Sequence, residues 1–327
     1  MTPRATIALL NWNGGDFVRP CLDSVLRQSE QNIEIVVVDN HSSDGSADVI
    51  EALLDASSVK YELVRLDENR GICGGLQVAL DRAAGEYFFP FASDDEMQPD
   101  RVDRQCNQLD AAGPTTQIAA GAVALIGPDS EPLRNWFGRP LILRPPRYEG
   151  GDPATTMTFS LAVPPAPGLA FRTSGLRSIG GYDVTAPIED VDTFSRLVLL
   201  GGSRVATTDD VVSRYRRHGS NASRRTDLMA NGLEHTLRTL VDSGVDFGPV
   251  RDYWLKYLEA RSQGYTSPWA NLLKTLATEP LERSAVRSAG LGVWRPQLRM
   301  STSRRIRASV AIVAPTLAAR WVGRMKG

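Results

Sequence analysis

The stretch that decides the fold runs from Phe88 to Asp100 and reads Phe-Phe-Pro-Phe-Ala-Ser-Asp-Asp-Glu-Met-Gln-Pro-Asp. Its apolar first part predicts a buried strand, which ends abruptly in the adjacent carboxylates Asp94 and Asp95. Pro99 follows where a helix is expected to begin. In an open parallel sheet ligands bind at the carboxyl ends of the strands, and divalent cations prefer oxygen ligands. The carboxylates therefore form either a cation site or a cap on the following helix, because acids also favour helix N-termini.

Upstream of this stretch, strands and helices alternate regularly. Short apolar strands are expected at residues 6–10, 33–38, 61–66 and 86–91, with helical periodicity between them. This alternation predicts an α/β fold with a parallel sheet and helices on both faces. Because parallel strands all point the same way, the polar residues that follow three of them should converge on one edge of the sheet. These polar residues are 11–13, Asp39 with Asp44, and 94–95.

Composition and motifs exclude several classes of protein. The chain has 327 residues, of which 42% are hydrophobic and 23% charged, as in ordinary globular proteins. No Gly-x-Gly-x-x-Gly follows the first strand and no Gly-x-x-x-x-Gly-Lys loop occurs, which argues against dinucleotide dehydrogenases and P-loop kinases. The three cysteines are widely spaced, and neither a secretory signal nor a membrane-spanning segment is expected, so we predict a cytoplasmic protein without disulfides. A nucleotide site formed by acids and a bridging metal remains.

Four motifs, in order and at the right spacing, resemble the family 2 glycosyltransferases of the GT-A fold. They are Asn11-Trp12-Asn13, Val-Val-Asp39-Asn-His-Ser-Ser-Asp44-Gly, Glu-Asn69-Arg-Gly71 and Ser-Asp94-Asp95-Glu-Met-Gln-Pro99-Asp100. The resemblance implies a Rossmann-like, mostly parallel sheet on which Asp39 contacts the base and ribose of a nucleotide-sugar. It also implies that Asn11, Asn69 and Arg70 line the nucleotide pocket. The alternative for Asp39 is a turn-forming role.

In that family an Asp-x-Asp motif holds the metal and the diphosphate. Counted back from Pro99, Asp94 matches the last, metal-binding acid, whereas Ala92 occupies the position of the first acid. This departure suggests that Asp95 or a water takes over the ribose contact. The segment around His218 resembles the family's third metal ligand, so Asp94 and His218 are expected to hold Mn²⁺ or Mg²⁺. The alternative for His218 is an ordinary surface side chain, and His41 and His235 are interpreted as structural.

A second acidic motif follows Gly180-Gly181-Tyr182-Asp183 and reads Glu189-Asp190-Val-Asp192 at the start of an expected helix. By the same resemblance, the second acid of the Glu-Asp pair is the general base. We therefore expect Asp190 to be the general base, with Glu189 and Asp192 as alternatives. Glu189 and Asp192 are also expected to contact the substrate. Taken alone, these acids also fit a helix N-terminus, where the helix dipole favours negative charge.

The remaining segments carry weaker signals. Residues 127–167 are rich in Pro, Gly and Arg, and their aromatic side chains are either sugar-stacking platforms or local packing; these are Trp136, Phe137 and Tyr148. We expect a catalytic domain at 1–225, made of a nucleotide-binding half (1–112) and an acceptor-binding half (113–225). Residues 226–327 are expected to form a helical C-terminal appendage. The net charge of the chain is −1, but residues 281–327 carry +9, which predicts contact with an anionic membrane surface rather than nucleic acid.

Together these features predict an inverting glycosyltransferase at the cytoplasmic face of a membrane. Its donor is a nucleoside diphosphate sugar, with a UDP-sugar as the first expectation, and its acceptor is the hydroxyl of a glycan, a lipid-linked intermediate or a related molecule of cell-envelope or extracellular polysaccharide or glycolipid synthesis. Two alternatives stay open: a nucleotide-sugar-binding module without turnover, motivated by Ala92, and a sugar-phosphate nucleotidylyltransferase. The latter needs a basic Gly-rich loop after the first strand, and residues 11–15 contain no basic residue.

Overall fold

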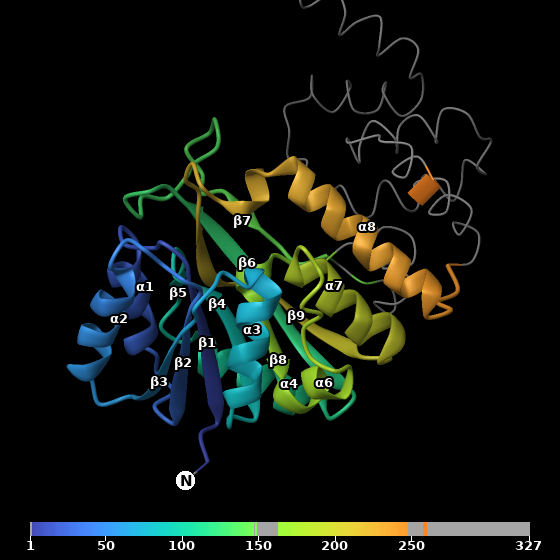
Figure 1. Cartoon of the computed structure of the whole chain (residues 1–327), viewed down its shortest axis with the longest axis horizontal. Helices are drawn as coiled ribbons and strands as arrows, with labels where there is room; N and C mark the ends of the chain where they lie inside the picture. The colour runs from blue at the N-terminus through green and yellow to red at the C-terminus, as the bar shows by residue number, and fades with distance from the viewer. Residues whose placement is uncertain (1, 147, 149–162, 248–257, 260–327) are drawn as a thin grey trace, which may run out of the picture.

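The computed structural model of the chain describes residues 2–146, 148, 163–247 and 258–259 (Figure 1). Within them, nine strands form one sheet in the order β3-β2-β1-β4-β8-β6-β9-β5, with β7 beside β6. The strands are β1 (Ala5–Asn11), β2 (Ile33–Asp39), β3 (Lys60–Arg65), β4 (Tyr87–Ala92), β5 (Glu96–Met97), β6 (Thr116–Ile126), β7 (Ile142–Leu143), β8 (Leu169–Arg172) and β9 (Arg204–Arg216).

The first four strands form the parallel half of the sheet, as the alternation predicts. β1 pairs in parallel with β2 and β4, and β2 pairs in parallel with β3. The second half is mixed, because β8 runs antiparallel to both β4 and β6, whereas β6 and β9 are parallel. The two-residue strand β5 follows the acidic motif and pairs antiparallel with the end of β9. This pairing brings the motif beside a segment more than 110 residues later.

Different helices cover the two faces of the sheet (Figure 1). The helices are α1 (Val18–Leu26), α2 (Ser46–Asp55), α3 (Gly71–Arg82), α4 (Arg101–Ala112), α6 (Thr173–Ser178), α7 (Glu189–Ser195) and α8 (Thr226–Asp242). Ile7 and Leu9 of β1 pack with α1, α2 and α4, whereas Ala8 between them packs with α3, α6, α7 and α8. Since both faces are buried, the strands read as continuous apolar runs.

The long helix α8 shares the core of the sheet. Leu237 and Leu240 are fully buried in the cluster that contains Phe194 of α7 and Leu197. Some of the region expected to be a separate appendage therefore packs directly on the catalytic body, and the domain division at residue 225 stays a prediction. The basic tail from residue 281 onward lies outside the described residues. Across the described ranges, no helix combines the length and the apolar character that a membrane crossing requires.

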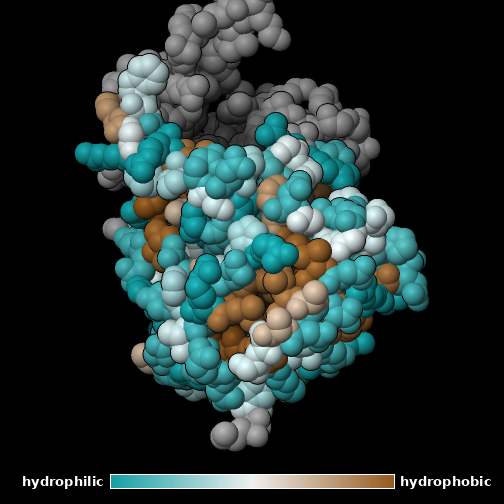
Figure 2. Space-filling view, turned by 90° about the vertical axis from the view of Figure 1, so that its left-hand side faces the viewer, coloured by the Kyte–Doolittle hydropathy of each residue, from teal (hydrophilic) through white to brown (hydrophobic). Residues whose placement is uncertain are grey.

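β3 forms the exposed edge of the parallel half. Figure 2 views the molecule from the side on which α2 and β3 lie, where a strip of apolar surface is surrounded by hydrophilic side chains. The exposed side chains of β3 are the charged Lys60, Glu62 and Arg65. Lys60 pairs with Glu34 of β2 at 2.8 Å. Charged side chains on an edge strand oppose pairing with a further strand.

Candidate active site

The ends of β1, β2 and β4 meet at one edge of the sheet, as predicted, and Asn11 joins them. Its side chain is fully buried and donates from Nδ2 to Asp39 Oδ1 at 2.7 Å and to Ser46 Oγ at 2.8 Å. Its Oδ1 accepts a hydrogen bond from Ser93 Oγ at 2.8 Å. Ser93 directly precedes the two carboxylates of the acidic motif. An amide fits this position because it donates and accepts at the same time.

Both carboxylate oxygens of Asp39 accept hydrogen bonds from other groups of the protein. Oδ1 accepts from Asn11, and Oδ2 accepts from the backbone N–H of Ser42 at 3.0 Å. The side chain is only 4% exposed. The turn-forming role of Asp39 is thus present in the structure, and its contact with base and ribose stays a prediction.

Asn69 and Arg70 shape the turn that precedes α3. Asn69 Oδ1 accepts from Asn40 Nδ2 at 3.1 Å and from the backbone N–H of Gly71 at 2.9 Å. Asn40 Oδ1 in turn accepts from the backbone N–H of Arg70 at 2.8 Å. The Arg70 side chain is about half exposed, and its nearest acidic partner is Glu68 at 3.7 Å. Asn69 therefore fixes the turn, while the Arg70 guanidinium keeps surface available for a ligand.

The structure brings Asp94 and His218 together, although they are 124 residues apart in the sequence. His218 Nε2 lies 2.8 Å from Asp94 Oδ2, and His218 Nδ1 lies 2.8 Å from Ser220 Oγ. The His218 ring packs on Phe17 with centroids 4.7 Å apart. The side chains of Asp94 and His218 stay 24% and 11% exposed, so a ligand can reach both. The N-cap residue of α4 is Asp100, and the side chain that accepts from its first turn is Gln28, whose Oε1 accepts from the backbone N–H of Val102 at 3.1 Å. Asp94 faces His218 instead, so the helix-cap interpretation of Asp94 is wrong.

Arg216 and Asn221, which were not predicted from the sequence to be site residues, contact the Asp94–His218 pair. Asn221 donates from Nδ2 to the backbone oxygen of Arg216 at 3.0 Å and lies 3.0 Å from His218 Nε2. Arg216 is fully buried and donates from Nε to the backbone oxygen of Asp94 and from Nη2 to Glu96, both at 2.7 Å. Both residues flank His218 in the sequence, but nothing in their spacing indicates that one of them is buried beneath the acidic motif.

Asp95 faces the interior rather than the ligand side. It is 2% exposed, and its Oδ1 accepts from the backbone N–H of Arg216 at 2.9 Å. Burial, together with the neighbouring Asp94 charge, raises the pKa of Asp95 well above its usual value. This geometry argues against the direct sugar contact expected of Asp95 as a substitute at Ala92. Residues 93 and 94 form a turn between β4 and β5, in which Asp94 lies at the open edge beside His218 while Asp95 turns inward.

Glu189 and Asp190 form the first turn of α7 and share a partly buried environment. Burial, with a further contribution from the Asp190 charge, raises the pKa of Glu189 to about 8. Burial also raises the pKa of Asp190, although its Oδ1 accepts from the backbone N–H of Val191 at 2.7 Å. The pKa of Glu189 is therefore raised far enough for this pair of acids to retain a proton near neutral pH, and the two carboxyls titrate as a pair.

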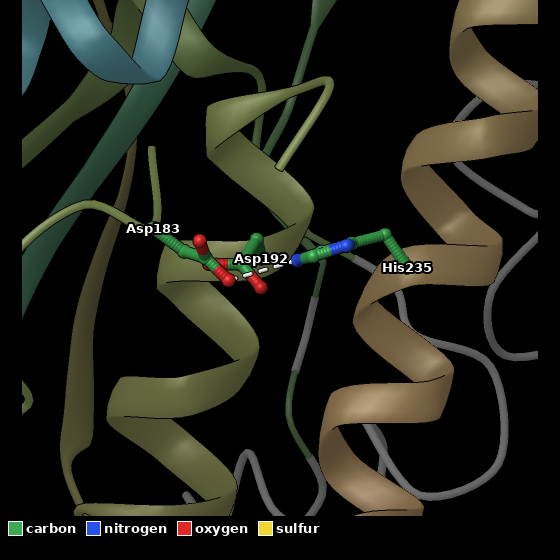
Figure 3. A group of neighbouring side chains, drawn as sticks. All are labelled: Asp183, Asp192 and His235. Carbon is green, nitrogen blue, oxygen red and sulfur yellow. Dashed lines mark hydrogen bonds and ion pairs between the residues drawn. The ribbon is translucent and has the colours of Figure 1, made fainter. Parts of the chain in front are cut away.

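Asp192 lies in the interior, which argues against the substrate contact expected of it. It is fully buried, and its Oδ2 accepts from Arg196 Nε at 2.7 Å. Residues two apart on a helix point to nearly opposite sides, so Asp192 faces inward on the side of α7 away from the partly exposed Asp190. The structure places Asp192 beside Asp183 and His235, and His235 Nε2 lies 2.8 Å from Asp183 Oδ2 (Figure 3).

The three aromatic candidates of residues 127–167 separate into two groups. Trp136 and Phe137 are 96% and 83% exposed, so local packing does not account for them. Tyr148 instead stacks on Phe194 with ring centroids 6.3 Å apart, and burial raises the pKa of its hydroxyl. Local packing is therefore the role of Tyr148, and sugar stacking stays a prediction for Trp136 and Phe137 alone.

Comparison with known proteins identifies the family to which part of the chain is similar. Residues 6–160 match the family model described as glycosyl transferase family 2, and this range contains the polar strand ends and the acidic motif. The chain carries a family 2 glycosyltransferase domain. The resemblance inferred from the four motifs is thereby confirmed.

Sequence relatives of the family 2 domain include proteins of bacterial polysaccharide synthesis. Succinoglycan biosynthesis protein ExoO of Rhizobium meliloti is 32% identical over 132 residues, which are 40% of this chain and 36% of ExoO. TuaG of Bacillus subtilis, named as a candidate glycosyltransferase of teichuronic acid biosynthesis, is 30% identical over 103 residues, which are 32% of this chain and 40% of TuaG. The aligned region thus spans well under half of these relatives.

Solved structures confirm the GT-A fold, and their similarity extends beyond residues 6–160. The mannosyltransferase PcManGT from Pyrobaculum calidifontis, in complex with GDP-Man and Mn²⁺, matches with a TM-score of 0.60 at 19% identity over 98% of this chain and 88% of that chain. TarS 1–349 of S. aureus, in complex with UDP, matches with a TM-score of 0.57 at 15% identity over 86% of this chain and 77% of that chain. At these identities the likeness shows the fold alone.

Proposed function

We propose that this chain is an inverting glycosyltransferase that moves a sugar from a nucleoside diphosphate sugar to an acceptor hydroxyl. The observation that carries the proposal is the Asp94–His218 pair, 2.8 Å apart, at the strand-end edge of a family 2 domain. The relatives ExoO and TuaG are named for succinoglycan and teichuronic acid biosynthesis, which supports an acceptor in cell-envelope or extracellular polysaccharide synthesis. The structural neighbours hold GDP-Man in one case and UDP in the other; a UDP-sugar remains our first expectation for this chain.

Asp94 and His218 fit a divalent cation by the chemistry of their donor atoms. One carboxylate oxygen and one imidazole nitrogen lie close together with part of each side chain exposed, so diphosphate oxygens can complete the coordination. An imidazole ligand suits Mn²⁺ better than Mg²⁺, which prefers oxygen alone. When bound there, the ion supplies positive charge that stabilises the departing nucleoside diphosphate.

Asp190 is the residue that we assign as general base. Burial raises the pKa of its neighbour Glu189 to about 8, so the pair retains a proton near neutral pH, and we assign that proton to Glu189 and the negative charge to Asp190. The carboxylate of Asp190 takes the proton of the acceptor hydroxyl, whose oxygen then forms a bond to the anomeric carbon. The bond from that carbon to the diphosphate breaks on the opposite side. A single displacement of this kind inverts the configuration.

A nucleotide-sugar-binding module without turnover is the second candidate, and Ala92 at the first position of the acidic motif favours it. The two functions differ in one measurement, the release of nucleoside diphosphate with and without acceptor. A thermal-shift screen of UDP-, GDP- and other nucleotide-sugars, each with and without Mn²⁺, identifies the donor first. Acceptor-dependent release of the nucleoside diphosphate then supports the transferase, and tight metal-dependent binding without release supports the module.

The matched control for the donor site is Asp16→Ala, which removes an exposed carboxylate from the same part of the chain and leaves the acidic motif unchanged. Asp94→Ala should abolish the effect of Mn²⁺ on donor binding, whereas Asp16→Ala should retain it. Donor binding that responds equally to Mn²⁺ in both variants would contradict the assignment of Asp94.

A further inference from the structure

The side chains of Asp183, Asp192 and His235 meet between α7 and α8 (Figure 3). One ligand atom of each lies within 4.8 Å of the other two, and the closest pair is His235 Nε2 and Asp183 Oδ2 at 2.8 Å. First-row divalent cations bind carboxylate oxygen and imidazole nitrogen at about 2.0–2.2 Å, which places the ligand atoms around one ion roughly 3–4.4 Å apart. Small side-chain shifts are therefore enough for these three groups to enclose a cation.

Asp192 distinguishes this cluster from an ordinary ion pair. Its side chain is 0% exposed, and while Oδ2 accepts from Arg196 Nε, its Oδ1 is buried without a hydrogen-bond partner. Burial of a charged oxygen is unfavourable unless a donor or a cation compensates for the lost water. Figure 3 shows the Asp192 carboxylate beside that of Asp183, both near the tip of the His235 ring. A cation bound among the three groups would supply the missing partner.

Neighbouring hydrogen bonds orient the two carboxylates. Asp183 Oδ1 accepts from the backbone N–H of Thr185 at 2.9 Å and from its hydroxyl at 2.6 Å, which leaves Oδ2 on the side of His235. Arg196 occupies Asp192 Oδ2 and also donates to the backbone oxygens of Ile179 and Gly181 at 3.0 and 2.8 Å. Bonds of this kind around a metal ligand fix its orientation and raise the affinity of the site. The oxygens that face the cluster are thus held in place.

We propose that Asp183, Asp192 and His235 bind a first-row divalent transition-metal ion, with Zn²⁺ and Mn²⁺ as the expected species. Two carboxylates and one imidazole suit such ions, whereas Mg²⁺ and Ca²⁺ prefer oxygen ligands throughout. The three ligands come from the turn before α7, from α7 and from α8. The bound ion would therefore cross-link α8 to the helix whose first turn carries Glu189 and Asp190. It is a second site, built from elements other than those that carry Asp94 and His218.

The test is a metal titration of the full-length Asp94→Ala variant, freed of metal with a chelator. The Asp94→Ala substitution removes a carboxylate ligand of the proposed donor-site ion, so that this ion does not interfere. Zn²⁺ is added with a competing indicator, and Co²⁺ is added separately as a probe with visible absorption. One equivalent should bind and raise the Tm. His235→Ala and Asp183→Asn, each added to this background, should weaken binding at least 10-fold. His41→Asn is the matched control, because His41 is exposed at a φ of 67° that Asn tolerates, and it should bind as before.

Each variant is also measured in chelator alone, because His235→Ala removes the ion pair with Asp183 whatever else it does. The decisive quantity is the rise in Tm that the metal induces. A rise that is lost in His235→Ala and in Asp183→Asn supports the site. If His235→Ala fails to fold, Asp183→Asn decides alone, since its amide retains the shape of the carboxylate. A metal-induced rise that persists in these variants, or the absence of any bound equivalent in the Asp94→Ala background, overturns the proposal and leaves an ion pair.

Discussion

Replacement of Glu189 by Gln should remove a pH dependence of stability that the wild-type chain carries. The pKa of Glu189 is raised from its usual 4.5 to about 8, because its carboxyl is buried and Asp190 lies beside it. An acid with a raised pKa binds its proton more tightly in the folded state than in the unfolded state. Between pH 4.5 and pH 8 the folded state therefore holds more protons, and the free energy of unfolding falls as the pH rises through this window.

The magnitude follows from the same shift. A pKa difference of this size corresponds to about 5 kcal/mol for a carboxyl wholly removed from water, at 1.36 kcal/mol for each pH unit. Glu189 keeps part of its surface exposed, and solvent screening reduces the expected loss to roughly 1–3 kcal/mol between pH 5 and pH 8.5. Glu189→Gln, which is neutral throughout, should be more stable than the wild type at pH 8.5 by that amount and nearly equal to it at pH 5.

Urea unfolding at pH 5, 7 and 8.5 measures this difference. Glu68→Gln is the matched control, because the Glu68 side chain is 75% exposed, and its pH profile should follow that of the wild type. Asp190→Asn should give an intermediate profile, since it removes the neighbouring charge but not the burial. Wild type and Glu189→Gln profiles that run parallel from pH 5 to pH 8.5 would refute the reasoning. The proton would then not reside on Glu189, and the assignment of Asp190 as the ionised member of the pair would lose its support.

Asp190→Asn should lower turnover about 10²-fold or more while donor affinity stays near normal, because the amide keeps the shape but accepts no proton; near-normal turnover would move the base to Glu189. Asp94→Ala should abolish the strengthening of UDP binding by Mn²⁺, and His218→Ala should weaken it, as measured by calorimetry with and without the ion; an unchanged metal response in Asp94→Ala would place the ion elsewhere. Reversal of three tail charges in the full chain, Arg304, Arg305 and Arg307 to Glu, should reduce binding to anionic liposomes at low salt at least 100-fold, since each basic residue near such a surface contributes on the order of 1 kcal/mol. Wild-type protein that floats equally well with neutral liposomes would exclude this membrane contact.

The parallel half of the fold was predictable because its signals are local. β1, β2 and β4 are mainly apolar, β3 alternates charged with apolar residues, and each of the four strands is followed by polar residues and, further on, a helix. The mixed half was not predictable to the same degree. β5 has only two residues, Glu96 and Met97, and its partners Arg214 and Ser213 lie far along the chain. No local pattern encodes a strand of that length, which is defined by its pairing with β9.

The candidate site shows the same limit at the level of single side chains. The sequence places Asp94 next to Asp95 and Asp190 near Asp192, but it does not say which member of each pair faces a ligand. In the structure Asp95 and Asp192 turn inward, where they meet Arg216 and Arg196 respectively. The direction depends on the turn between β4 and β5 in the first pair and on the rotation of the helix in the second. Both depend on a register that only the folded chain fixes.

The 124-residue separation between Asp94 and His218 has a consequence during synthesis of the chain. The ribosome releases the N-terminal end first, so β1 to β4 and the polar residues at their ends have emerged long before His218. An unfinished chain, or one cut short before residue 218, contains the acidic motif but lacks its partner. Such a fragment would bind nucleotide-sugars weakly at most and would not hydrolyse them. Assembly of the Asp94–His218 pair thus has to wait until synthesis of the chain has passed residue 218.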